Sequence, residues 1–294
     1  MREEWFPHRP HPALRGLVTA AVGYRQEGLP AGVHRGLPSP HLTLVVTLDE
    51  PLRMAAHPDP RQAPGEFDAL LGGLHTTPAL ISHPGRQAGV QLALTPLGAR
   101  RLLGLPAGEL AALDCPPADV LGRAGAELTE RFRAARTWPE RFAALERVLL
   151  RGVRDSGLRH GGAPDGGAPP PEVAEAWRLT TASGGRMRVA EIAARVGWSE
   201  RHLGARFRTE TGLSPKEAAR VVRFDRARRA LAARVGAGRS PDLAGLAVAA
   251  GFADQAHLTR EWRAFSGLSP TRWLAAEVRF VQDGGPPVTA RSSA

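Results

Sequence analysis

The chain has 294 residues, more than a single domain usually holds, so two domains are the first expectation. It carries 39 basic and 29 acidic side chains, and the formal net charge of +10 favours an anionic partner such as nucleic acid. A single cysteine, Cys115, excludes an intramolecular disulfide framework and a zinc cluster built from cysteines. The sequence shows no signal-peptide pattern and no run of about 18 apolar residues, so we expect a cytoplasmic protein without a membrane partner.

The first 155 residues predict a strand-rich domain. Residues 41–48 form a β-branched run and residues 89–95 alternate apolar with polar side chains, so both segments are predicted strands. Residues 17–24 and 79–82 are weaker strand candidates. Thr95 and Pro96 are typical of a helix start, and two longer helices are expected at about 118–135 and 139–154. We therefore predict an α+β domain at residues 1–155, in which the strands are followed by a helical pair.

Side chains that could carry chemistry in this domain form no recognised catalytic or metal-binding pattern. Seven histidines lie within the first 85 residues, but their spacings match no standard ligand motif. Residues 72–75 lack the lysine and the following helix of a phosphate-binding loop. Cys115 precedes two prolines and lacks the His and Arg of an alkyl-accepting motif. We therefore expect no enzyme activity, cofactor or metal; the alternative is a DNA-targeted enzyme or alkylation-repair protein with a catalytic N-terminal domain.

A composition change marks the domain boundary. Residues 156–171 hold five Gly and four Pro in sixteen positions, a composition typical of a flexible linker. Residues 1–171 contain 19 basic and 17 acidic groups, whereas residues 172–294 contain 20 and 12. The net charge is therefore +2 before the boundary and +8 after it, which assigns the anionic partner to the second domain. We place that domain at residues 172–282 and expect a disordered tail at residues 283–294.

The basic part contains an internal repeat. The tetrapeptide Gly-Leu-Ser-Pro occurs at 212–215 and again at 267–270, a period of 55 residues. Each copy follows a short apolar-periodic segment, a Gly and a second segment with an apolar pair at i, i+4. Two short helices joined by a tight turn form a helix-turn-helix. We therefore predict two such units in an all-α domain, at about residues 189–208 and 243–263.

A long helix is predicted between the two units. Ser214, Pro215 and Glu217 have the spacing of a capping box, and no Gly or Pro follows before about Ala233. About 18 helical residues span roughly 27 Å, close to the 34 Å that separates successive major-groove faces of B-DNA. Ser240 and Pro241 are a predicted start for the second unit. The arginines on the long helix, Arg220, Arg223, Arg226, Arg228 and Arg229, are open to two roles: pairing with neighbouring acids or contact with phosphate.

The outer face of the second helix in each unit carries side chains of the kinds that read base edges and phosphates. Together, the repeat, the long helix and the segment at 251–262 resemble the AraC/XylS family of bacterial transcriptional regulators over roughly residues 175–278. The resemblance implies that one helix of each unit enters successive major grooves. The predicted DNA-contacting residues are Arg201, His202, Arg206, Gln255, His257, Thr259 and Arg260. The chain departs from the family at Gly204 and Ala205, where a large polar residue is common.

The resemblance also implies roles for the first domain. In this family a strand-rich part followed by a helical pair commonly senses a small molecule or dimerises. The expected function is therefore sequence-specific transcriptional regulation through double-stranded DNA. A small-molecule effector, a second copy of the chain and RNA polymerase are the further partners that the resemblance implies.

Overall fold

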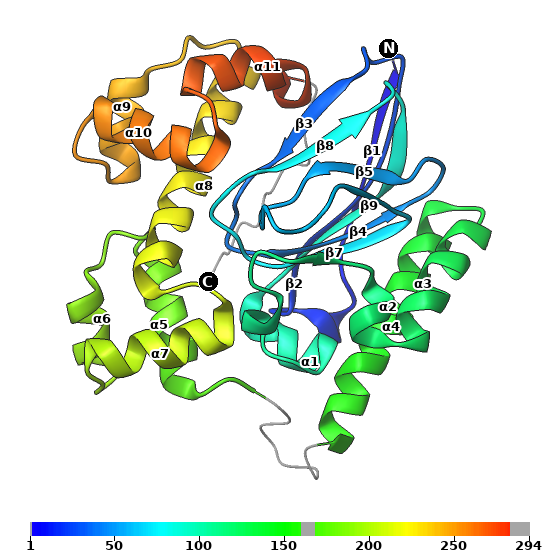
Figure 1. Cartoon of the computed structure of the whole chain (residues 1–294), viewed down its shortest axis with the longest axis horizontal. Coiled ribbons are helices and arrows are strands. Elements are labelled where there is room, and N and C mark those ends of the chain that lie inside the picture. The colour runs from blue at the N-terminus through cyan, green and yellow to red at the C-terminus, as the bar shows by residue number, and fades with distance from the viewer. Residues whose placement is uncertain (1, 160–167, 283–294) are drawn as a thin grey trace.

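The computed structural model describes residues 2–159 and 168–282. Residues 2–159 contain the strands with the helices that cover them, and residues 168–282 are helical (Figure 1). The helical part lies beside the strand-rich part and is organised along its longest helix, α8 (Pro215–Gly236). The predicted fold class, a strand-rich N-terminal part and a helical C-terminal part, is confirmed.

Two antiparallel sheets form the strand-rich part within residues 2–159. The larger sheet has the order β1-β2-β9-β4-β7-β10, with the bounds Arg2–His8, Val18–Glu27, Gln87–Leu94, Leu42–Thr47, Ala69–Gly72 and Asp114–Cys115. The smaller sheet has the order β3-β8-β5-β6, with the bounds Gly32–Gly36, Ala79–His83, Leu52–Ala56 and Gly65–Phe67. The four predicted strands correspond to β4, β9, β2 and β8, and the other strands carried too weak an alternation to be predicted.

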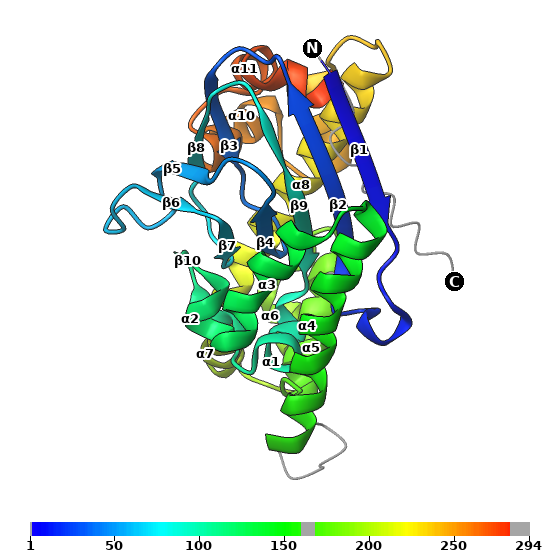
Figure 2. The ribbon, with the colours of Figure 1, turned by 90° about the vertical axis from the view of Figure 1, so that its right-hand side faces the viewer.

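Helices cover one face of the larger sheet (Figure 2). Short 3₁₀ turns occur at Pro12–Leu14 (η1), Pro96–Gly98 (η2) and Ala107–Leu110 (η3). The α-helices are Ala99–Leu103 (α1), Pro117–Leu121 (α2), Arg123–Ala134 (α3) and Trp138–Arg159 (α4). Leu44 and Leu92 of the sheet pack in one apolar cluster with Phe132 and Leu145 of α3 and α4. The opposite face of the sheet is covered by the smaller sheet, around Met54 and Leu70.

Two predictions for this part need correction. The single helix expected at about 118–135 is interrupted at Gly122, whose φ of +57° suits glycine and separates α2 from α3. The linker predicted at 156–171 begins too early, because α4 continues to Arg159. Extending a formed helix by a few residues costs little, so the Gly content at 156–159 does not end it. Residues 160–167 and the predicted tail at 283–294 lie outside the described residues.

The helical part after residue 168 has its own core. Its helices are Pro171–Ala182 (α5), Val189–Arg195 (α6), Glu200–Thr211 (α7), α8, Leu243–Ala250 (α9), Gln255–Ser266 (α10) and Pro270–Gln282 (α11). Phe207 of α7, Phe224 of α8 and Trp262 of α10 are fully buried in one cluster. In the part of the chain that the structure describes, no helix has the length and apolar character needed to cross a membrane.

The two parts share an apolar boundary. Leu74, from the strand-rich part, is fully buried in the core of the helical part. Leu37 and Leu97 pack against the same core from the same side. The helical part is therefore docked onto the strand-rich part in this structure.

Candidate nucleic-acid interface

The first helix-turn-helix unit consists of α6 and α7. Gly197, with φ of +74°, lies in the turn between them, and the Ser199 side chain caps α7 by accepting from the backbone N–H of His202 at 3.2 Å. Leu203 and Phe207 are fully buried and hold α7 against the core. The unit predicted at 189–208 is therefore a helix-turn-helix, and its second helix continues to Thr211.

The second unit consists of α9 and α10 and repeats this construction. Gly251 has φ of +84° in the turn, and the Asp254 carboxylate accepts from the backbone N–H of His257 at 2.6 Å. Leu258 and Trp262 are fully buried. The start of α9 differs from the prediction, because Asp242 caps it through the backbone N–H of Gly245 at 2.9 Å. The Ser240–Pro241 pair lies just before this cap and does not begin the helix.

α8 joins the two units and is longer than predicted. Its capping box is present, with the Glu217 N–H donating to Ser214 Oγ at 3.2 Å and the Ser214 N–H donating to Glu217 Oε2 at 2.8 Å. The helix has 22 residues, which corresponds to about 33 Å at 1.5 Å per residue. Its length therefore matches the roughly 34 Å repeat of one face of B-DNA.

The predicted contact residues of the first unit lie on the surface of α7. Arg201, His202 and Arg206 are exposed. Within the described residues, no ion pair involves either arginine, and the His202 ring lies edge-on to Trp198 with 4.5 Å between centroids. The two guanidinium groups are therefore available to an external acceptor.

The predicted contact residues of the second unit divide into two kinds. Gln255 and Arg260 are exposed. His257 and Thr259 are half-buried and already hydrogen-bonded: the Ala253 N–H donates to His257 Nδ1 at 3.3 Å, and Thr259 Oγ1 donates to the Gln255 carbonyl at 2.8 Å. His257 and Thr259 therefore also stabilise the start of α10. The side chains of Gln255 and Arg260 make no hydrogen bond to the described residues.

Several basic side chains along α8 are paired within the protein. Arg220 donates to both carboxylate oxygens of Glu261, at 2.8 and 3.0 Å, which ties α8 to α10. The buried Asp225 pairs with two arginines: its Oδ1 lies 2.7 Å from Arg228 Nη2, and its Oδ2 lies 2.8 Å from Arg229 Nη2. Burial acts to raise the pKa of Asp225, but the two arginines outweigh it and hold that pKa below its usual value. These arginines therefore have a structural role.

We name α7 and α10, the second helices of the two units, the first and second reading helices, and a groove lies beside α7. One wall is formed by Gly204, Ala205 and Arg208 of α7, and the other by Gly108 and Glu109 of η3, around a volume of about 370 Å³. Glu109 is exposed, so the strand-rich part places a carboxylate next to the α7 positions at which the chain lacks a large polar residue. Sequence reasoning did not predict this neighbour, because nothing in the local pattern at 104–111 indicates a partner 95 residues further along.

Ion pairs join the two parts at both ends of the helical region. Arg100 donates to both oxygens of the buried Glu210 at the end of α7. Glu277 of α11 is also buried; its Oε2 lies 2.8 Å from His34 Nδ1, and its Oε1 accepts from the Arg35 N–H at 3.2 Å. The first unit, through α7, and α11, which follows the second unit, are therefore both attached to the strand-rich part.

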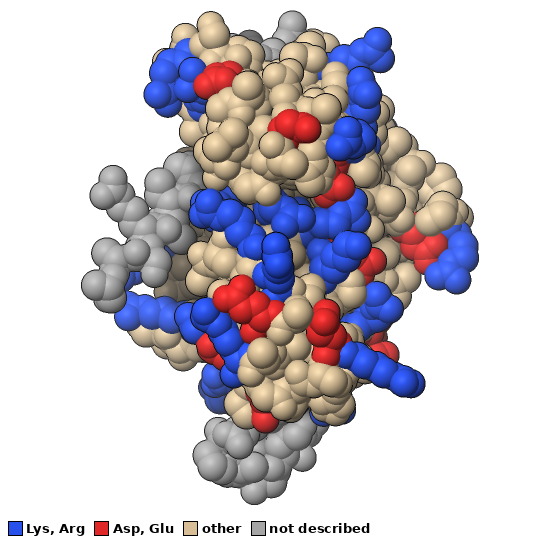
Figure 3. Space-filling view, turned by 90° about the vertical axis from the view of Figure 1, so that its left-hand side faces the viewer, with Lys and Arg blue, Asp and Glu red and all other residues tan. Residues whose placement is uncertain are grey.

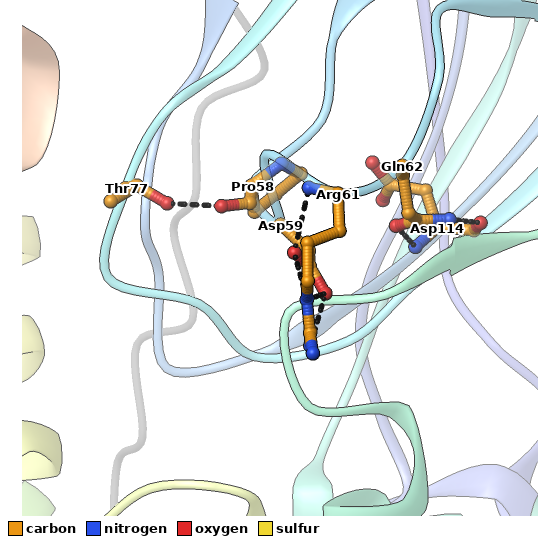
Figure 4. Close-up of polar contacts among 6 residues, drawn as sticks. All are labelled: Pro58, Asp59, Arg61, Gln62, Thr77 and Asp114. Atoms are coloured by element: carbon orange, nitrogen blue, oxygen red, sulfur yellow. Dashed lines mark hydrogen bonds and ion pairs between the residues drawn. The ribbon is translucent and has the colours of Figure 1, made fainter.

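Polar groups of the strand-rich part are engaged in local structure. The buried His57 and Asp114 lie 2.8 Å apart, and the Gln62 side chain exchanges two hydrogen bonds with the Asp114 backbone, at 2.8 and 3.0 Å. Figure 4 shows Gln62 bonded to Asp114 of β10, and the Arg61–Asp59 pair within the loop that carries Gln62. No group of three His, Cys, Asp or Glu side chains in the described ranges is arranged to hold a metal.

Cys115 does not lie in an environment that activates a thiol. It is half-buried, and burial, with a smaller effect of Asp119 and Asp114, raises the pKa of its thiol to about 11. A reactive cysteine needs a lowered pKa, because the thiolate is the nucleophile.

A second feature of the strand-rich part is a cavity of about 20 Å³ between the two sheets, lined by residues that include Tyr24 and Ile81. That volume corresponds to about one water molecule.

The basic surface, the tandem units and their spacing define a DNA-binding protein of the helix-turn-helix class (Figure 3). The sequence agrees: residues 192–276 match the family described as helix-turn-helix domain. This part of the chain is a helix-turn-helix domain of the AraC type, as the resemblance implied. No curated protein matches the chain significantly.

Solved structures with a similar fold are crystal structures of ToxT from Vibrio cholerae. One ToxT structure at 1.65 Å resolution has 12% sequence identity and a TM-score of 0.50, and the match covers 87% of this chain and 97% of ToxT. A structure of an apo ToxT variant has 11% identity, a TM-score of 0.50 and the same coverage of both chains. The similarity therefore extends over both parts of the chain and concerns the fold. The matched helix-turn-helix domain supports a DNA-binding transcriptional regulator.

Proposed function

We propose that this protein is a sequence-specific transcriptional regulator that reads two successive major-groove segments of double-stranded DNA. The observation that carries the proposal is the pair of helix-turn-helix units joined by α8, whose length of about 33 Å matches one helical repeat of DNA. The exposed side chains of α7 and α10 supply the recognition chemistry. Arg201, Arg206, Gln255 and Arg260 are the residues we assign to DNA, with His202, His257 and Thr259 beside them.

Selection of bound sequences from a random DNA pool tests this function. The expected result is a motif with two half-sites about 10 base pairs apart, since each unit reads one major-groove segment. Arg260→Ala is expected to weaken binding to the selected site by about 1–3 kcal/mol and to relax the preference at one position. Arg123→Ala in α3 is the control, because Arg123 is 93% exposed and lies in the strand-rich part. Recovery of no motif by the full chain would overturn the proposal.

The strand-rich part would regulate this activity. It contacts α7 through η3 and Arg100, so any change that moves η3 also changes the surroundings of the first reading helix. We propose a small-molecule effector as the cause of such a change, acting in the cytoplasm where the DNA is. DNA affinity measured with and without candidate effectors tests this role, and an affinity that no compound changes counts against it.

A second copy of the chain and RNA polymerase are the remaining proposed partners. Sedimentation of the purified protein over a range of concentrations tests self-association, and a purely monomeric protein would remove the dimer from the proposal. Transcription from a promoter that carries the selected motif tests the polymerase contact. In that assay, occupancy of the site without any change in transcript level would limit the function to DNA binding.

A further inference from the structure

The arginines at positions 220–229 of α8 separate into two groups in the structure. Arg220, Arg228 and Arg229 have carboxylate partners, as described above. Over residues 2–159 and 168–282, no ion pair engages Arg223 or Arg226. These two residues are one turn apart on α8 and close to its midpoint, so their charges lie between the two helix-turn-helix units.

The surroundings of Arg223 provide no ion-pair partner among the described residues. The side chain is half-buried; its Nη1 donates to the Gly185 carbonyl at 2.7 Å, and its buried Nε has no hydrogen-bond partner in the structure. Burial, as the largest cause, and the nearby Arg220 lower the pKa of Arg223, whereas Glu261 raises it. A partly desolvated cation without a carboxylate is costly, and an external anion would offset that cost.

Arg186 joins these residues from the turn between α5 and α6. Consecutive glycines, Gly184 and Gly185, both have positive φ, and this lets the turn lie directly on α8. A Cβ atom at position 251 would lie 2.7 Å from Arg186 Cγ and 3.8 Å from Arg223 Cδ. Arg186 therefore crosses from the first half of the helical region to the turn of the second unit.

Arg226 completes the group. A Cβ atom at position 184 would overlap its guanidinium, so Arg226 lies against the same turn that carries Arg186. Arg186 and Arg226 are exposed. We name Arg186, Arg223 and Arg226 the central arginine cluster. Figure 3 shows Lys and Arg side chains gathered in a band across the middle of this face, between the two lobes of the molecule.

We propose that the central arginine cluster binds the phosphates of the DNA backbone between the two major-groove segments. The proposal rests on the function proposed above and adds a third contact to it. When α7 and α10 enter successive major-groove segments on the same side of the DNA, the minor groove lies between the two units. The phosphates that border this minor groove then face the middle of α8. Guanidinium groups suit this role, because they present several donors to phosphate oxygens. Such contacts hold the register of the two units and carry no sequence information.

Salt dependence separates a phosphate contact from a purely structural role. Each phosphate contact contributes about 0.9 to the slope of log K against log salt concentration. Arg226→Gln is therefore expected to lower the slope by about 0.9 and to reduce affinity about eightfold at 0.1 M salt. The motif selected from random DNA should stay unchanged, and phosphate ethylation should cease to interfere at the centre of the site. Arg226→Lys should recover most of the slope, because it keeps the charge.

The controls address charge and folding. Arg123→Gln changes the net charge equally at an exposed site in α3 and should leave the slope unchanged. Arg226 is exposed, so its substitution is not expected to disturb folding, and a second variant, Arg186→Gln, tests the same prediction from a different element. Wild-type slope and ethylation pattern in both variants, with wild-type protein binding its motif, would overturn the cluster while leaving the proposed function intact. Failure of the wild-type protein to select any motif would instead reject the proposed function.

Discussion

Arg100 and Glu210 connect the strand-rich part to the end of the first reading helix by two parallel hydrogen bonds of 2.8 and 2.9 Å. The Glu210 side chain is 4% exposed, and that of Arg100 is 30% exposed. Bidentate pairing of this kind fixes both the distance and the relative orientation of the two groups. The pair is therefore a specific docking contact between α1 and α7.

Removal of Arg100 is expected to destabilise the protein. Arg100→Ala leaves the buried carboxylate of Glu210 without its donors, and we expect a loss of about 1–3 kcal/mol in the free energy of unfolding. Urea unfolding monitored by circular dichroism measures this loss. Arg178→Ala is the matched control, because the Arg178–Glu175 pair is exposed and screened by solvent and should contribute little to stability. Equal stability of the two variants would contradict a specific role for Arg100.

Gly108 predicts a second effect at the same boundary. A Cβ atom at this position would overlap the Thr209 carbonyl oxygen and lie 2.8 Å from that of Arg208. Backbone atoms cannot rotate away, so Gly108→Ala should push η3 from α7 and cost about 1–3 kcal/mol. Gly204→Ala, on the other side of the groove, meets no atom within 4 Å and should stabilise α7 by up to about 1 kcal/mol. Thermal unfolding compares the two, and a Gly108→Ala protein as stable as wild type would show that the contact is not tight.

His41 predicts a pH dependence. Burial, as the largest cause, lowers its pKa to about 4, while Asp225 raises it and Arg229 lowers it. The folded state thus favours the neutral ring, and this contribution to stability is present above the unfolded pKa of about 6.5. It is lost as the pH falls towards 4, by about 2 kcal/mol between pH 7.5 and 5. Denaturant unfolding of wild type and His41→Gln at both pH values tests this. Equal losses in the two proteins would exclude His41 as the cause.

Cys115 provides a test of the alternative in which the first part is catalytic. With a thiol pKa raised to about 11, the folded protein at pH 8 should hold about 100-fold less thiolate than an unfolded chain with a pKa near 9. We therefore expect slow alkylation by iodoacetamide in the native state and fast alkylation in urea, followed by mass spectrometry. Rapid native alkylation would indicate an activated thiol and would favour the catalytic alternative.

The helix-turn-helix units were predictable because their signals are local. Leu203 and Phe207, and their counterparts Leu258 and Trp262, lie one turn apart and follow the recognisable helix starts at Ser199 and Asp254. The cap at Ser214 needs only a three-residue spacing, and the structure contains it. Patterns that span three or four residues indicate local structure, and the helices and caps of these units depend mainly on contacts between residues close in the sequence.

The boundary between the two parts was not predictable, because its residues are isolated in the sequence. Leu74 is a single leucine beside two glycines, and Arg100 finds its partner 110 residues away. Strands such as β3 and β7 are short, and the burial pattern of β7 is uniform rather than alternating. The role of Arg220 on α8 was likewise undecided, since its pairing depends on Glu261 from another helix.

The attachment of Glu210 and Glu277 has a mechanical consequence. Glu210 belongs to the first unit, and Glu277 lies on α11, whose Trp273 packs against Trp262 of the second unit with ring centroids 5.3 Å apart. The two units are thus connected twice, once through α8 and once through the strand-rich part (Figure 1). Two rigid connections in parallel form a closed frame, in which neither unit can rotate about α8 unless the strand-rich part deforms or releases one carboxylate. The twist between the two reading helices, and with it the phasing of the DNA that they fit together, is therefore set by both parts of the chain.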